Sequence, residues 1–150
     1  MVTEFVGGEV VVYVEMDSAG DVGGTQFSLR FDPAVMSISS VSGVGVNTDI
    51  TSGDGAPGGT AVNVNAENAA LGELGVVLNF TSGEVARLEA GTRRVVRMLF
   101  HPTGYAKRID LSGLRFSDDV VRRETVDREG NVIDIVPETL GLGAGVELSR

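Results

Sequence analysis

Apolar residues recur at every second position along most of this chain, and this period of two constrains the fold more than any other feature of the sequence. It is clearest in Val10–Met16 and in Phe27–Phe31, where polar side chains separate the apolar ones. Such a period places alternate side chains on opposite faces of a β-strand. Further strands are predicted at Val62–Val64, Val76–Phe80, Val95–Phe100, Ile109–Leu111, Leu114–Phe116, Val132–Val136 and Val146–Leu148.

Turn-forming residues separate these candidate strands and indicate the fold class. Glycine accounts for 21 of the 150 residues, and clusters of turn residues lie at 17–24, 47–59, 81–91 and 127–131. The helical signals are two short segments, 32–36 and 84–88, and Asp32 in the first can accept from free N–H groups. Short strands separated by turns are typical of antiparallel sandwiches. We predict one domain over residues 1–150, an all-β antiparallel jelly-roll β-sandwich of about nine strands.

The charge of the chain argues against two classes of partner. Twelve basic and 21 acidic residues give a formal net charge of −9, which repels nucleic-acid phosphates and anionic membrane surfaces. The excess lies within residues 1–86, where Arg30 is the one basic residue. This asymmetry indicates either an acidic surface for a basic partner or cation, or a feature that serves solubility, and we favour solubility.

Two features that the sequence lacks narrow the range of functions that we consider. The chain has no cysteine, which excludes disulfides and thiolate chemistry and leaves the fold to its core. No apolar run approaches the roughly 20 residues of a membrane span, and no basic-then-apolar leader is present. We therefore expect no membrane insertion.

Catalytic and metal-binding signals are weak. His101 is the one histidine, and no nucleophile-elbow pattern accompanies it, so we interpret it as a strand-end residue with a water-exposed edge and predict no catalytic residues. Two oxygen-rich loops are candidate calcium sites. Asp17 and Asp21 lie in the first loop, and Asp49 and Asp54 lie in the second. Neither has the ligand order of a calcium-binding loop, and turns of this composition ordinarily bond their own backbone. We expect no cofactor, with calcium as the alternative.

Charged residues on two candidate strands have open interpretations. Arg97 lies in an apolar strand and is expected to face away from Arg94, either paired with a carboxylate or anchoring a partner. The segments 122–124 and 127–129 flank a predicted hairpin. Their charges are expected to pair across neighbouring strands, and the alternative is a charged recognition edge.

Three parts of the sequence resemble bacterial cohesin-like domains. In the first, an alternating strand ends in an aromatic-Asp-Pro corner before an aliphatic residue. In the second, a Gly-Glu-Leu-Gly start is followed later by an Ala-Gly-Thr step into an apolar strand. In the third, Phe-Ser-Asp precedes a charged hairpin. These parts are Gly20–Met36, Gly72–Leu78 with Ala90–Val96, and Phe116–Asp118 with Arg123–Asp127 and Gly130–Val132, and together they span roughly residues 6–148.

This resemblance implies a nine-stranded jelly-roll sandwich of the cohesin and carbohydrate-binding-module-like superfamily, without catalytic function. Its best-known members bind a dockerin module through one sheet face. On this basis we expect a non-catalytic protein-interaction module with a dockerin-like partner. We expect it outside the cell or at the cell surface, exported as part of a longer multidomain precursor. No motif matches a dockerin-contact position, so the binding face is not predicted.

One departure from the family leaves an alternative open. Cohesins begin with a strand before the Gly-Gly-Glu-Val-Val-Val segment, and here only Met1–Phe5 is available for it. The first strand is therefore short, missing or supplied by another chain, and the last case would make a self-assembling subunit that works by strand exchange. A carbohydrate-binding module is a third alternative, disfavoured by an aromatic content of 5%.

Overall fold

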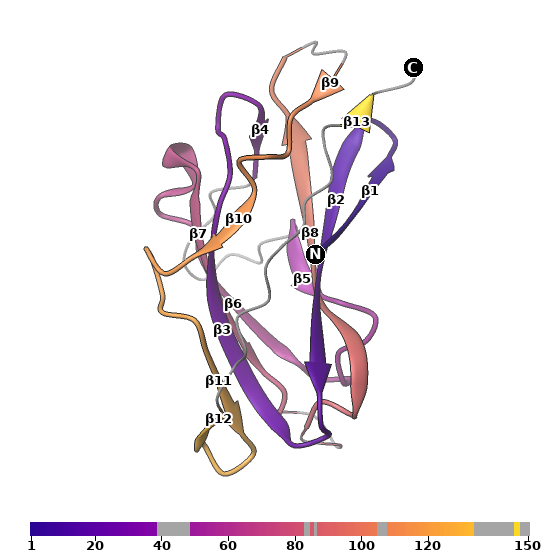
Figure 1. The fold of residues 1–150 in the computed structure, drawn as a ribbon, viewed down its shortest axis with the longest axis vertical. Coiled ribbons are helices and arrows are strands. Elements are labelled where there is room, and N and C mark those ends of the chain that lie inside the picture. Colours follow the sequence, from indigo (N-terminus) through magenta and orange to yellow (C-terminus); the bar gives the residue numbers. More distant parts are fainter. Residues whose placement is uncertain (39–48, 83–84, 86, 105–107, 134–145, 148–150) are drawn as a thin grey trace.

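The chain folds into two antiparallel β-sheets that pack face to face (Figure 1). The computed structural model describes residues 1–38, 49–82, 85, 87–104, 108–133 and 146–147. The all-β antiparallel sandwich expected from the sequence is confirmed. No helix in the described part of the chain is long and apolar enough to cross a membrane.

The first sheet, called here the β2–β8 sheet, contains two long central strands. Its strands lie in the order β1 (Val2–Val6), β2 (Glu9–Ser18), β8 (Gly91–Pro102) and β4 (Met36–Ser37), and β5 (Ile50–Ser52) also pairs with β8. The register between β2 and β8 shifts between Val14 and Glu15, which marks a β-bulge.

The second sheet, called here the β3–β7 sheet, has β3 and β7 at its centre. Its strands lie in the order β12 (Val132–Ile133), β11 (Glu124–Asp127), β3 (Val22–Arg30), β7 (Glu73–Asn79) and β6 (Ala61–Asn65), and β10 (Arg115–Ser117) also pairs with β3. A short ladder joins β9 (Arg108–Ile109) to β13 (Val146–Glu147). The 3₁₀ helix η1 (Ala69–Leu71) precedes β7.

The core lies between the two sheets, and the alternation in the sequence builds it. Phe31 and Phe100 meet edge to face there with ring centroids 5.2 Å apart. The buried core side chains of the four central strands include Val10, Val12, Val14, Phe27, Leu29, Leu74, Val76, Leu78, Val96, Met98 and Phe100. Burial of this apolar surface stabilises the fold by roughly 25 cal/mol per Å².

The strand count differs from the prediction. The described residues form thirteen strands, not about nine. The four strands that the period of two did not predict are β1, β4, β5 and β11. β4 and β5 have two and three residues, too few to show a period of two.

The start of the chain forms its own strand. β1 pairs with β2 from Val2↔Tyr13 to Val6↔Glu9, through a turn in which Gly7 and Gly8 both have positive φ. Of the three possibilities that the sequence left open, the first strand is therefore short and supplied by the chain itself.

Of the predictions for short segments, some are confirmed, one is wrong and others concern residues that the structure does not describe. At 32–36 the chain makes the predicted turn, in which Asp32 Oδ1 accepts from the Ala34 N–H at 2.9 Å. The predicted turn at 17–24 is wrong over most of its length, because β2 runs on to Ser18 and β3 already begins at Val22. Most of the predicted strand at 132–136 and parts of the segments 84–88 and 146–148 lie outside the described residues.

Candidate interaction surface

The outer face of the β3–β7 sheet carries a mixture of amides, valines and glycines. Residues directly opposite one another in an antiparallel pair share a face, so the strand register identifies its members. From β6 to β12 these are Ala61, Asn63, Asn65, Glu73, Gly75, Val77, Asn79, Gly24, Gln26, Ser28, Arg30, Glu124, Val126 and Val132. Val132 is 64% exposed, so apolar surface lies open to solvent at the edge of this face.

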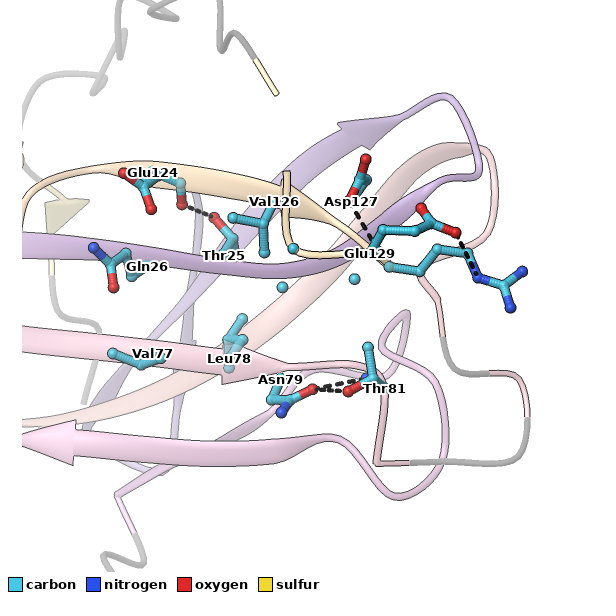
Figure 2. Close-up of a pocket in the computed structure, with 14 residues that line it drawn as sticks. Thr25, Gln26, Val77, Leu78, Asn79, Thr81, Glu124, Val126, Asp127 and Glu129 are labelled. Atoms are coloured by element: carbon cyan, nitrogen blue, oxygen red, sulfur yellow. Dashed lines mark hydrogen bonds and ion pairs between the residues drawn. The ribbon is translucent and has the colours of Figure 1, made fainter. Parts of the chain in front are cut away.

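A hollow of about 400 Å³ lies on this face over β11, β3 and β7. Its floor is at Gly24, where a Cβ atom would lie 2.9 Å from the carbonyl oxygen of Leu78. Val126 and Val77 line it from the flanking strands, with Gln26 between them (Figure 2). The hollow exists because two neighbouring strands approach where one of them has no side chain.

The turn between β11 and β12 forms one rim of the hollow and is fixed by Asp127 (Figure 2). Its Oδ1 atom accepts from the backbone N–H of Glu129 at 2.9 Å and of Asn131 at 2.8 Å, and Oδ2 accepts from Asn131 Nδ2 at 2.8 Å. The bonds from the side chain and backbone of Asn131 hold the pKa of Asp127 below its usual value. The carboxylate therefore stays ionised and adds fixed negative charge to the rim.

A segment between β10 and β11 crosses the same outer face, and we call residues 118–123 the crossing segment. Ser28, which is fully buried, holds it: Ser28 Oγ donates to the Val121 carbonyl at 2.7 Å and accepts from the N–H groups of Val120 at 3.1 Å and Val121 at 2.7 Å. Gly75 makes room beneath, because a Cβ atom there would lie 2.8 Å from Val120 Cγ1.

Arg30 ties the crossing segment to the sheet beyond Ser28. Its guanidinium lies 2.8 Å from Glu73 Oε1 and 2.8 Å from Asp119 Oδ2. The hydrogen bond to Glu73 and the charge of Asp119 raise the pKa of Arg30 above its usual value. All three groups are partly exposed, so the bridge positions the segment more than it stabilises the fold.

His101 belongs to a separate cluster on the outer face of the β2–β8 sheet. Its Nδ1 atom lies 2.7 Å from Glu9 Oε2 and its Nε2 atom 3.0 Å from Asp49 Oδ2. Burial by itself lowers the pKa of His101, but the hydrogen bond and charge of Asp49, and then those of Glu9, outweigh it and raise the pKa above 6.5. His101 was predicted to have a water-exposed edge, and its side chain is 41% exposed. Both ring nitrogens, however, contact carboxylates.

The calcium candidates are dispersed over different contacts. Asp17 accepts from the hydroxyl of Thr92, Asp49 is buried beside His101, and Asp21 and Asp54 are exposed. Among the described residues no three histidine or acidic side chains are grouped to hold a metal ion. A calcium site at these residues stays an untested alternative.

The arginines of β8 do not lie as expected. Val95 and Val96 are both buried in the core, because the bulge at Val14–Glu15 shifts the alternation by one residue. Arg94 stacks 4.3 Å above the ring of Tyr13, and Arg97 is directly opposite Tyr13. The prediction that Arg97 faces away from Arg94 is therefore wrong.

The charges around the β11–β12 hairpin also differ from expectation. Arg128 and Glu129, which are adjacent in the sequence, lie 3.6 Å apart, so this pair runs along the turn and not across strands. Arg123 lies over the ring of Phe116 at 5.7 Å.

Sequence reasoning missed the hollow and the crossing segment. One signal was available for the hollow: Gly23-Gly24 inside an alternating pattern indicates close backbone approach, but these residues were assigned to a turn. No signal was available for the crossing segment. Ser28, Gly75 and Val121 are ordinary residues in the sequence, and only folding brings them together.

Comparison with solved structures finds cohesins. A type II cohesin domain from the cellulosome of Acetivibrio cellulolyticus matches with a TM-score of 0.62 and 18% identity, over 98% of this chain and 92% of that one. The cohesin in a type II cohesin–X–dockerin complex from the same organism matches with a TM-score of 0.58 and 21% identity, over 87% and 84% of the two chains.

A non-cellulosomal cohesin from the archaeon Archaeoglobus fulgidus matches with a TM-score of 0.57 and 16% identity, over 85% of this chain and 74% of that one. Comparisons with protein-family models and with curated proteins give no match. At these identities the likeness concerns the backbone and not particular contact residues. It shows that the chain has the cohesin fold.

Proposed function

We propose that residues 1–150 form a single, non-catalytic protein-interaction module that binds its partner through the outer face of the β3–β7 sheet. The hollow over Gly24 carries this proposal. It offers Val77 and Val126 as apolar contacts, with amides and carboxylates around them. An apolar centre with a polar rim is the arrangement found at protein interfaces.

A dockerin-like module is the partner that we propose. Two of the structurally similar cohesins are in complexes with dockerins, one of type II from Acetivibrio cellulolyticus and one of type I from Clostridium thermocellum. The rim is acidic at Asp127 and Glu124, which favours a partner with basic residues beside an apolar contact. The module would act in an exported or cell-surface multidomain protein.

Three observations favour this function over its alternatives. A strand-exchange subunit needs an acceptor edge beside β2, but β1 already pairs there within the chain. A carbohydrate-binding face stacks sugars on open aromatic rings, but the guanidinium of Arg94 covers Tyr13. For catalysis, His101 would need a free ring nitrogen, and both face carboxylates.

Titration calorimetry against a panel of purified type I and type II dockerin modules tests the proposal. We expect at least one module to bind, and Val77→Arg to weaken that binding at least tenfold, because a buried charge without a partner is costly at an interface. Ser112→Arg, which places the same charge on an exposed turn, is the matched control. Equal binding by both variants, or no binding by any module, would contradict the proposal.

A further inference from the structure

Among the residues that the structure describes, β6 is an edge strand whose sequence lacks the protective features of the other edges. Sheet edges present unpaired backbone groups, and proteins blunt them with short strands, charges, prolines or bulges. The edge strands β4, β5 and β12 are two, three and two residues long. The five residues of β1 include Glu4, which approaches Arg94 at 3.3 Å.

β6 has none of these devices. Its sequence Ala-Val-Asn-Val-Asn contains no charge and no proline, and its register with β7 runs without a shift from Ala61↔Asn79 to Asn65↔Gly75. Within the described part of the chain, β7 is its one strand partner. The backbone N–H and C=O groups of alternate β6 residues therefore point away from the sheet.

The two faces of β6 are suited to another strand. Val62 and Val64 are partly buried against the core, and a neighbouring strand with apolar residues on the same face would cover them further. Asn63 and Asn65 are on the outer face and are exposed. An added strand thus needs small β-branched residues that alternate with uncharged polar ones.

We propose that β6 pairs antiparallel with β6 of a second copy of this chain, about a twofold axis at Asn63. In this register Val62 of each chain is opposite Val64 of the other, and Ala61 is opposite Asn65. The two Asn63 side chains meet at the axis, where each amide can both donate and accept. Such a contact is isologous and closes as a dimer.

The sequence of β6 is complementary to itself, which favours a second copy of this chain over an unrelated extended peptide as the partner. β6 reads nearly the same from either end, as polar or small residues around two valines. It is also neutral in a chain of net charge −9, so pairing of two β6 strands brings no like charges together within the strands. Screening of the remaining long-range repulsion should make the dimer stronger as salt is added.

This inference goes beyond the proposed function and does not depend on it. The pairing uses the backbone edge of β6, whereas partner binding uses the hollow over β11, β3 and β7. Asn63 is opposite Val77 in the register, so the dimer would join two binding faces into one continuous sheet surface. A module that binds a dockerin only as a monomer would leave the proposed function intact and remove the dimer.

Cysteine cross-linking tests the register directly, because the chain has no cysteine of its own. Directly opposed residues of an antiparallel pair have Cα atoms about 4.5–5.5 Å apart, within the range of about 4.4–6.8 Å that a disulfide spans. Asn63→Cys is therefore expected to form disulfide dimers under mild oxidation. Asn65→Cys is the matched control, since its two copies would be about 14 Å apart.

The expected result is a dimer band on non-reducing gels for Asn63→Cys and at least a tenfold weaker band for Asn65→Cys. Equal bands would indicate random collision, and a stronger band for Asn65→Cys would indicate another register. Either result, or no cross-link in both variants, would overturn the proposed pairing.

Light scattering on the protein without cysteines gives an independent test. The mass should rise from the 15.6 kDa of one chain towards twice that value with increasing concentration and salt. Asn63→Lys, which brings two like charges together at the axis, should weaken dimerisation at least tenfold. Ser112→Lys, on an exposed turn, should not weaken it. A monomer at all concentrations up to about 1 mM, or equal dimerisation by both variants, would contradict the inference.

Discussion

At the scale of single residues, small polar groups organise the outer face of the β3–β7 sheet. Ser28 is the clearest case, because one hydroxyl satisfies a carbonyl and two N–H groups of the crossing segment. The sequence predicted that Ser28 alternates with apolar neighbours, which places it on the outer face. It could not predict that this side chain is buried, since the residues that cover it are 92 and 93 positions away.

Ser28→Ala should destabilise the protein. The substitution leaves the backbone groups of Val120 and Val121 without their partner, which costs about 1–3 kcal/mol. Chemical denaturation of both proteins measures this difference in the free energy of unfolding. Ser52→Ala, at an exposed position of β5, is the control and should change it by less than about 0.5 kcal/mol. A similar small change for Ser28→Ala would contradict the anchoring role.

The cluster around His101 predicts a pH dependence of stability. Because Asp49 and Glu9 raise the pKa of His101 above 6.5, the folded state binds its proton more tightly than the unfolded state does. The stabilisation is therefore complete below about pH 6.5 and is lost as the pH rises through the folded pKa.

Denaturation of the wild type and His101→Gln from pH 5.5 to 9 measures this contribution. The wild type should be the more stable protein by a margin that shrinks as the pH rises. A margin that is constant or grows with pH would show that the protonated histidine does not stabilise the fold.

At the scale of the elements, the period of two predicts the long strands and fails at their irregularities. β2, β3, β7 and β8 follow from alternation, because each buries one row of side chains against the core. The bulge at Val14–Glu15 reversed the expected orientation of Arg97, since a bulge shifts the alternation without changing composition. The start of β3 was missed because its glycines resemble a turn.

Gly23→Ala tests how closely β3 and β11 approach. A Cβ atom at Gly23 would lie 2.5 Å from the carbonyl oxygen of Asp127, so one of the two strands must move. We expect a loss of about 1–3 kcal/mol in the free energy of unfolding. Gly58→Ala is the matched control, because its Cβ atom would meet nothing within 4 Å. Equal stability of the two variants would contradict the close packing of the strands.

At the scale of the whole molecule, folding brings carboxylates of the acidic first part against arginines of the second part. Arg94 of the second part lies 3.3 Å from Glu4 and 3.6 Å from Glu15 of the first part. The pair of Arg30 and Asp119 has the reverse arrangement, because here the first part supplies the basic residue. The charge asymmetry along the sequence is thus partly balanced between neighbouring strands. The sandwich could be predicted because its signal is periodic. The proposed binding face could not be predicted, because it combines strands from distant parts of the chain.

The central claim is that the outer face of the β3–β7 sheet binds a dockerin-like module. Nuclear magnetic resonance of the ¹⁵N-labelled protein, titrated with each dockerin module of the panel, tests it most directly. The account predicts that one module shifts the amide signals of Gly24, Val77 and Val126 and leaves those of Tyr13 and Arg97 unchanged. Shifts concentrated at Tyr13 and Arg97, or no shifts with any module, would contradict it.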